Sequence, residues 1–276
     1  MLTEGPDWQL IAEVNPPELP DMSHLLLDGT WTNVLITDNV FGRIRVSPYA
    51  FAARITHDLP SVHPTVVVST RDRNILAIES EVRGAVGNGV DSFLVVVGDT
   101  MPAVEHMANH YEIVTHLRSL QGQLPPIEVG MPTRFQRWQY LRRIDLGAQF
   151  FVAGPVLDPK TVDENVARLD RGPDDPPLYL MVIPPFSPSW IEQMEAVGAI
   201  AVTDGLRDRV AALDGASRRR LAWDTCLQTA EIARDAGCAG VVVMGVRFDT
   251  VVDEAAAVWR GDSRWPFDKV VHRERR

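Results

Sequence analysis

The sequence contains only two cysteines, no excess of basic residues and no long apolar run. Cys226 and Cys238 are too few for a disulfide framework or a four-thiolate zinc site. The 37 acidic and 27 basic residues give a net charge of -10, which disfavours nucleic acid or an anionic membrane as a partner. No run is long enough to span a bilayer, and residues 1–7 do not have the pattern of a signal peptide. We therefore expect a cytoplasmic protein with no membrane or nucleic-acid partner.

What the sequence does contain is typical of one large globular domain. Of its 276 residues, 45% are hydrophobic and 23% are charged, so we expect a single domain over residues 1–276, with residues 266–276 as a tail. Short β-branched runs alternate with helical patterns, which is typical of βα units. Strands are expected at 10–14, 33–37, 65–69, 92–97, 127–130, 149–153, 178–183 and 240–244. Eight such runs, several of them continuously apolar, predict an α/β fold of the (β/α)8 TIM-barrel type.

The segments between these strands predict the helices and loops. Helices are expected at 75–84, 101–120, 136–146, 161–169, 189–197 and 217–236. Residues 40–48 have the composition of a loop. Residues 171–177 are rich in proline, glycine and aspartate, and they are interpreted as a long loop between a helix and a strand rather than as a domain boundary.

Glu13 is the main candidate for chemistry. It precedes Pro16 and Pro17, and because proline cannot donate to a sheet ladder, the first strand must end there. A carboxylate at this position would lie at the carboxyl rim of a barrel, where such folds hold their catalytic groups. The alternative is a solvated rim residue, which surface statistics alone favour. Asp99 follows an apolar run and Gly98, and it is either a ligand contact or a helix N-cap.

Several segments in the same order along the chain resemble the methylenetetrahydrofolate reductase family. They are the opening with Glu13 before two prolines, residues 69–74, residues 88–99 ending in Gly-Asp, residues 143–148 and residues 182–190. The resemblance implies a barrel that reduces 5,10-methylenetetrahydrofolate to 5-methyltetrahydrofolate in one-carbon metabolism and methionine biosynthesis. It implies catalytic roles for Glu13, as the acid that opens the methylene bridge, and for Asp99, beside the pterin.

The same resemblance implies further binding residues. Thr37 and Trp190 match positions that contact folate or the cofactor, Trp190 by stacking on a ring, and Gly98 belongs with Asp99 to the cofactor set. Arg71, together with Arg73, is placed to meet a phosphate or the folate glutamate tail. Their alternative is a solvated loop that pairs with Asp72. Asp38 and Asn39, directly after Thr37, are ranked lower because such residues favour turns.

The chain also departs from the family at its flavin contacts. Val67 replaces a histidine, Val97 replaces an arginine, and residues 129–134 and 153–156 lack the expected polar groups. FAD binding is therefore doubtful, and we expect direct hydride transfer from NADH or NADPH, with NADH favoured. Two alternatives stay open: an FAD-dependent reductase of the same family, and a non-catalytic folate- or nucleotide-binding barrel. The oligomeric state is also open.

A metal site is not expected. His106 and His110 are spaced to share one helical face, but the glutamate that a zincin needs directly after the first histidine is missing. The partner that remains is a small folate substrate.

Overall fold

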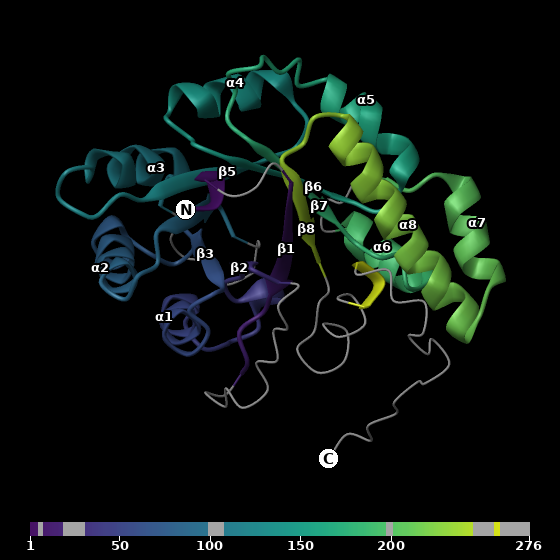
Figure 1. Ribbon diagram of the computed structural model, residues 1–276, viewed down its shortest axis with the longest axis horizontal. Coiled ribbons are helices and arrows are strands. Elements are labelled where there is room, and N and C mark those ends of the chain that lie inside the picture. Colours follow the sequence, from purple (N-terminus) through teal and green to yellow (C-terminus); the bar gives the residue numbers. More distant parts are fainter. Residues whose placement is uncertain (5–7, 19–30, 99–107, 197–200, 245–256, 260–276) are drawn as a thin grey trace.

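The computed structural model describes residues 1–4, 8–18, 31–98, 108–196, 201–244 and 257–259, and the predicted tail at 266–276 lies outside these ranges. Eight parallel strands pair in sequence order and close into a barrel surrounded by helices (Figure 1). The strands are β1 Gln9–Val14, β2 Asn33–Ile36, β3 His63–Ser69, β4 Ser92–Val96, β5 Glu128–Thr133, β6 Phe151–Val156, β7 Leu178–Val182 and β8 Gly240–Val243. The chain therefore has the predicted (β/α)8 barrel fold.

Three short 3-10 helices and eight α-helices accompany the strands in the part of the chain that the structure describes. They are η1 Leu2–Glu4, η2 Val40–Gly42, α1 Pro48–Asp58, α2 Ile75–Val86, α3 His110–Ser119, α4 Arg137–Asp145, η3 Pro159–Thr161, α5 Val162–Ala167, α6 Pro188–Ala196, α7 Asp204–Ala212 and α8 Gly215–Asp235. None of these helices is both long and apolar enough to cross a bilayer.

Alternate residues of each strand belong to two separate apolar shells, which explains the continuously apolar sequence runs. In β3, Val66 and Val68 pack in the shell between the barrel and the helices, whereas Val67 belongs to the cluster inside the barrel. The same alternation holds in β1, where Ala12 faces outward and Ile11 faces inward. A third cluster, formed by residues of α6, α7 and α8 together with Leu157, Ile183 and Val202, covers the β7 side.

All eight predicted strands are present, with ends that differ by a few residues, and the six predicted helical segments contain helices. The helix expected from residue 101 is described only from His110, because residues 101–107 lie outside the described ranges. The structure adds α1 and α7, which the sequence patterns had not indicated. Helix α1 starts at Pro48, the last residue of the segment 40–48 that was predicted as a loop, and η2 forms the first three residues of that segment.

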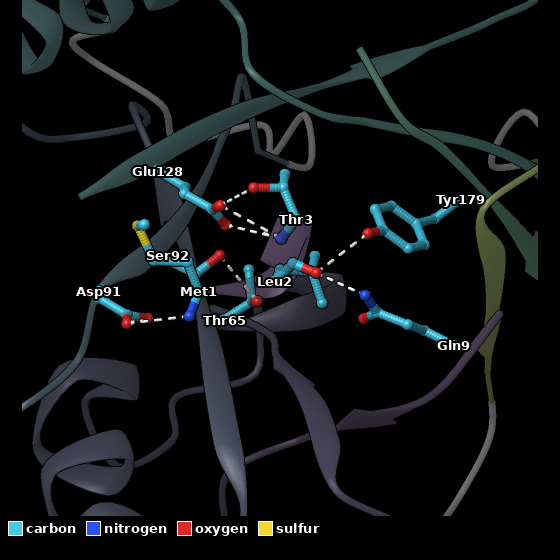
Figure 2. Close-up of polar contacts among 9 residues, drawn as sticks. All are labelled: Met1, Leu2, Thr3, Gln9, Thr65, Asp91, Ser92, Glu128 and Tyr179. Atoms are coloured by element: carbon cyan, nitrogen blue, oxygen red, sulfur yellow. Dashed lines mark hydrogen bonds and ion pairs between the residues drawn. The ribbon is translucent and has the colours of Figure 1, made fainter. Parts of the chain in front are cut away.

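The amino-terminal residues close the bottom of the barrel, at the end opposite the carboxyl rim (Figure 2). Leu2 is buried among the residues of the barrel interior. Its carbonyl oxygen accepts hydrogen bonds from Gln9 Nε2 at 2.5 Å and from the Tyr179 hydroxyl at 3.3 Å. The backbone N–H of Thr3 donates to both Glu128 carboxylate oxygens at 3.2 Å, and the Thr3 hydroxyl donates to Oε1 of the same residue. This end of the barrel is therefore filled and hydrogen-bonded, as expected for the stability face of the fold.

Glu128 makes this closure sensitive to pH. Burial raises the pKa of Glu128 above its ordinary value of 4.5, and the bonds from Thr3 lower it only in part. Above pH 4.5 the unfolded chain therefore loses this proton while the folded chain keeps it, so stability declines as pH rises through the folded pKa. We expect the unfolding free energy of the wild type, relative to that of Glu128→Gln, to fall as the pH rises from 4.5 and to level off above the folded-state pKa in urea titrations.

The control for this experiment is Glu192→Gln, which alters an exposed carboxylate on α6. Its stability difference from the wild type should not vary with pH over the same range. A Glu128→Gln difference that is equally constant would show that the carboxyl group carries no raised pKa in the folded state.

Candidate active site at the carboxyl rim

The alternation of inward and outward residues places three polar side chains inside the upper end of the barrel. Ile11, Leu35 and Val67 lie in the interior cluster, so the residues two positions further along each strand face the same way. These are Glu13 on β1, Thr37 directly after β2 and Ser69 on β3. All three are buried, with exposed fractions of 5%, 5% and 2%. Since β1, β2 and β3 are neighbours, the three side chains occupy one sector of the rim.

Glu13 pairs in register with Leu35 of β2, and the next residue, Val14, pairs with Ile36. The position that the sequence predicted for this carboxylate, at the carboxyl end of the first strand, is therefore confirmed. Its side chain is almost fully shielded from solvent, which contradicts the alternative of a solvated rim residue. Two other residues that pack against the interior cluster, Val96 of β4 and Met181 of β7, are apolar. The inner side of the barrel therefore carries both polar and apolar side chains.

Thr37 connects the ends of β1 and β2. Its backbone N–H donates to the Val14 carbonyl at 2.9 Å, and its hydroxyl lies 2.5 Å from Asn15 Oδ1 and 3.3 Å from the Val14 oxygen. Thr37 therefore holds the chain just beyond Glu13 through both its backbone and its side chain. The sequence placed Thr37 at this rim, but it did not indicate Asn15, whose partner is 22 residues away.

A partly buried ionic network begins at Asp38, the residue after Thr37. Arg73 forms an ion pair with Asp38, and its Nε lies 3.4 Å from Glu81 Oε2 without hydrogen-bond geometry. Its guanidinium also lies 5.7 Å from the centre of the Tyr49 ring. Although burial alone would lower the pKa of Arg73, the negative charge of Asp38 and the nearby Tyr49 and Glu81 raise it overall. The ion pairs of Arg73 with Asp38 and Glu81 give this side chain a structural role, and its predicted contact with a phosphate stays a prediction.

Burial is the main cause of the pKa shifts of the two other titratable groups near Arg73. It raises the pKa of Tyr49, whose hydroxyl has no hydrogen-bond partner among the described residues, and it also raises the pKa of Glu81. Asn39, next to Asp38, adopts a left-handed conformation with φ of 47°, and its amide donates to Asp38 at 2.9 Å. The prediction of turn chemistry at Asn39 is confirmed, whereas Asp38 has an ionic role as well.

Gly98 allows the ends of β3 and β4 to approach closely. It has φ of +87°, and a side chain there would collide with the Ser69 hydroxyl. This contact gives a structural reason for the glycine, and its predicted cofactor role stays a prediction.

Arg71 follows β3, is partly buried, and its backbone N–H donates to Ser69 Oγ at 3.4 Å. Asp99 lies outside the described residues, so its catalytic role also stays a prediction.

Trp190 is a residue of α6 and packs against the third cluster. Its backbone N–H donates to Ser187 Oγ at 3.1 Å. Its indole nitrogen is buried and has no hydrogen-bond partner among the residues that the structure describes. Stacking of Trp190 on a substrate ring therefore stays a prediction.

Within the described residues, neither a cluster of possible metal ligands nor a surface cavity indicates a second functional site. Among the residues that the structure describes, no three His, Cys, Asp or Glu side chains converge on a possible metal position. His106 lies outside those residues. A shallow surface cavity of about 430 Å³ lies between α3 and α4, lined by residues such as Tyr111, Thr115 and Leu146, on the outside of the barrel rather than at its rim.

Comparison with known proteins gives structural likeness only. No family model and no curated protein sequence matches the chain. Among solved structures, EDTA monooxygenase from Chelativorans sp. BNC1 matches with a TM-score of 0.54 and 13% identity, over 95% of this chain and 96% of that one. The 2,3-dimethylmalate lyase, a PEP mutase/isocitrate lyase superfamily member, matches with a TM-score of 0.54 and 13% identity over 94% and 81% of the two chains. These likenesses establish the fold alone.

A third similar structure is oxaloacetate acetylhydrolase in complex with 3,3-difluorooxalacetate, with a TM-score of 0.56 and 10% identity over 94% and 82% of the two chains. These three proteins are a monooxygenase, a lyase and a hydrolase, and none is a methylenetetrahydrofolate reductase. Together with the absence of a matching family model, they overturn the resemblance to that family. The identification as a methylenetetrahydrofolate reductase, the folate reduction and the role in methionine biosynthesis are therefore wrong.

Proposed function

We propose that this chain is an enzyme that acts on a small organic substrate bearing carboxylate groups, with Glu13 as its proton-transfer residue. The observation that carries the proposal is the position of Glu13, a carboxylate only 5% exposed that faces the interior at the carboxyl rim of the barrel. Barrel enzymes place their reacting groups at this rim. A shielded carboxylate is also the kind of group that proteins use to give or take a proton.

A second buried glutamate in the same barrel, Glu128, shows how a buried carboxylate with a purely structural role differs from Glu13. Glu128 is only 1% exposed, but it lies at the start of β5, at the closed end, and both of its oxygens accept bonds from Thr3. Its burial is therefore explained by the closure that it stabilises. Glu13 lies at the other end of the barrel, beside the hydroxyl-bearing positions 37 and 69, where a substrate has room for access in this fold.

Two observations support a carboxylate substrate: the names of the structurally similar proteins and the position of Arg71 at the rim. The similar structures carry the names of three polycarboxylates: EDTA, 2,3-dimethylmalate and oxaloacetate. With a net charge of -10 the protein as a whole repels such anions, so a local cation must bind them. Arg71, at the end of β3 and next to Ser69, is the residue we assign to this role, since a guanidinium binds a carboxylate through two parallel hydrogen bonds.

The proposal needs proton transfer only. NADH, NADPH and the absence of FAD were expected together with folate reduction, and no observation tests them, so they stay predictions. The cytoplasmic location also stays a prediction.

The proposal is tested by titrating the protein with oxaloacetate, malate, oxalate and EDTA, using dimethyl malonate as an uncharged control. We expect one or more of the carboxylates to bind, and Arg71→Gln to weaken that binding about 10- to 100-fold, because charge-assisted hydrogen bonds are worth about 1.5–3 kcal/mol. Arg168→Gln, which alters an exposed arginine on the outside of the barrel, is the matched control. Failure of all four anions to bind, or equal binding of dimethyl malonate, would contradict the proposed substrate class.

A further inference from the structure

We infer that Asn15 is a second substrate-contacting residue, whose side-chain amide donates a hydrogen bond to a substrate oxygen held beside Glu13. The inference rests on the proposed function and assigns to the same site a donor that neither the sequence nor the comparisons indicated. In outline, Glu13 moves the proton while Asn15 binds the oxygen on which negative charge collects.

The position of Asn15 follows from the strand geometry. Ile11 lies in the interior cluster, and every second residue of β1 faces the same way, so Asn15 follows Glu13 on the inner side of the rim. Glu13 is buried whereas Asn15 is partly exposed. The order along the strand is therefore an apolar floor at Ile11, a shielded carboxylate at Glu13 and an amide that a ligand can reach at Asn15.

The backbone around Asn15 is fixed on both sides. Before it, the Val14 carbonyl accepts from the Thr37 N–H at 2.9 Å. After it, the Pro16 carbonyl accepts from Arg45 Nη1 at 2.9 Å, and the Pro17 carbonyl accepts from the Val46 N–H at 2.9 Å. The prolines also restrict the backbone torsion angles of this segment. The amide of Asn15 is therefore held on a rigid strand end, which is the condition for a useful substrate donor.

The distance between the Thr37 hydroxyl and the Asn15 side chain fixes the orientation of the Asn15 amide. The Thr37 hydroxyl lies 2.5 Å from the amide oxygen of Asn15 and 3.3 Å from the Val14 carbonyl. A separation of 2.5 Å falls in the range of O–H···O bonds and is too short for N–H···O, so the atom that faces Thr37 is Oδ1 and the hydroxyl is the donor. Nδ2 must then point away from Thr37. Within the described part of the chain, Asn15 makes no hydrogen bond through Nδ2.

This arrangement suits an uncharged donor near a proton-transfer group. A carboxylate or carbonyl oxygen of the substrate can accept from Nδ2 while Glu13 exchanges a proton with the neighbouring atom. A donor that is already fixed costs no reorganisation when negative charge develops, and removing one such donor from an enzyme typically lowers kcat about 100- to 1,000-fold. Thr37 acts through Asn15 and is a positioning residue.

The test compares three variants on the carboxylate that the wild type converts. Asn15→Leu keeps the approximate volume, adds no charge and removes the donor, and we expect kcat to fall about 100-fold or more. Thr37→Val removes the hydroxyl that orients the amide, and it should lower kcat about 10-fold, whereas Thr37→Ser keeps the hydroxyl and should recover most of the loss. Side-chain amide NMR of the wild type, with the Asn15 signal assigned by Asn15→Ser, should show that signal shifting when the ligand binds.

The outcomes separate the inference from the proposed function. If Glu13→Gln abolishes turnover while Asn15→Leu keeps kcat and KM, or if the Asn15 amide signal does not move on binding, the role of Asn15 is wrong and the proposed function stands. If neither variant affects turnover, or if no carboxylate binds, both fail. The shift of the amide signal is recorded on folded wild-type protein, so it decides the question even where a kinetic variant does not fold. Only the assignment of that signal uses a variant, Asn15→Ser.

Discussion

Glu13→Gln should lower turnover of the carboxylate substrate by about 100- to 10,000-fold and leave its binding almost unchanged. This range is typical for the loss of a general acid or base. Glutamine keeps the size and hydrogen-bonding capacity of the side chain but cannot exchange a proton, so the loss should fall on kcat and not on KM. The measurement is substrate consumption followed by NMR, together with a ligand titration of the same variant.

The matched control for this experiment is Glu128→Gln. Both glutamates are buried in the same barrel, at 5% and 1% exposure, but Glu128 bonds to Thr3 at the closed end. Glu128→Gln should therefore alter the dependence of stability on pH and keep wild-type turnover. Equal activity of the wild type and Glu13→Gln would remove Glu13 from the mechanism, and equal losses in both glutamine variants would indicate a general effect on folding.

Arg73→Met should destabilise the protein by about 3–5 kcal/mol, the cost of leaving a buried charge without its partner. Arg73 forms an ion pair with Asp38, whose side chain is 2% exposed, and lies close to Glu81. Methionine keeps most of the volume but leaves two neighbouring carboxyl groups that repel each other. We expect the loss to appear in the free energy of unfolding measured in urea.

Two further variants define what the Arg73 result means. Arg168→Met breaks an exposed pair between positions 164 and 168 of one helical face, and it should cost less than about 1 kcal/mol. Combining Arg73→Met with Asp38→Asn removes one stranded charge and should recover part of the stability. A loss for Arg73→Met no larger than that for Arg168→Met would show that the network contributes nothing to the fold.

The barrel could be predicted from the sequence because its physical causes are local. Parallel strands covered on both faces require apolar residues at consecutive positions, as in Val66, Val67 and Val68. The stop after β1 is also local, since Pro16 and Pro17 have no N–H to donate. These two features together placed Glu13 at the carboxyl rim. Helix α1 was missed because its first residue, Pro48, fell within the segment 40–48 that was interpreted as a loop.

The family resemblance failed for a related reason. The segments on which it depended are mostly strand ends and turns, such as the two prolines after Glu13 and the Gly98–Asp99 pair. Gly98 is explained by its close contact with Ser69 and by its positive φ, which are requirements of backbone packing at a strand end. Residues of this kind recur wherever βα units end, so their order along the chain indicates a barrel without specifying its chemistry.

The sequence by itself therefore determined the strands, the barrel and the place of Glu13, because each depends on residues adjacent along the chain. Tertiary structure alone decided which groups surround them. Arg73 meets Asp38 across 35 residues, Thr37 meets Asn15 across 22, and Thr3 meets Glu128 across 125. Such contacts depend on how the barrel closes and on the register of its strands. The physical reason is that hydrophobic periodicity is encoded locally, whereas the pairing of buried polar groups is satisfied only once distant segments are brought together.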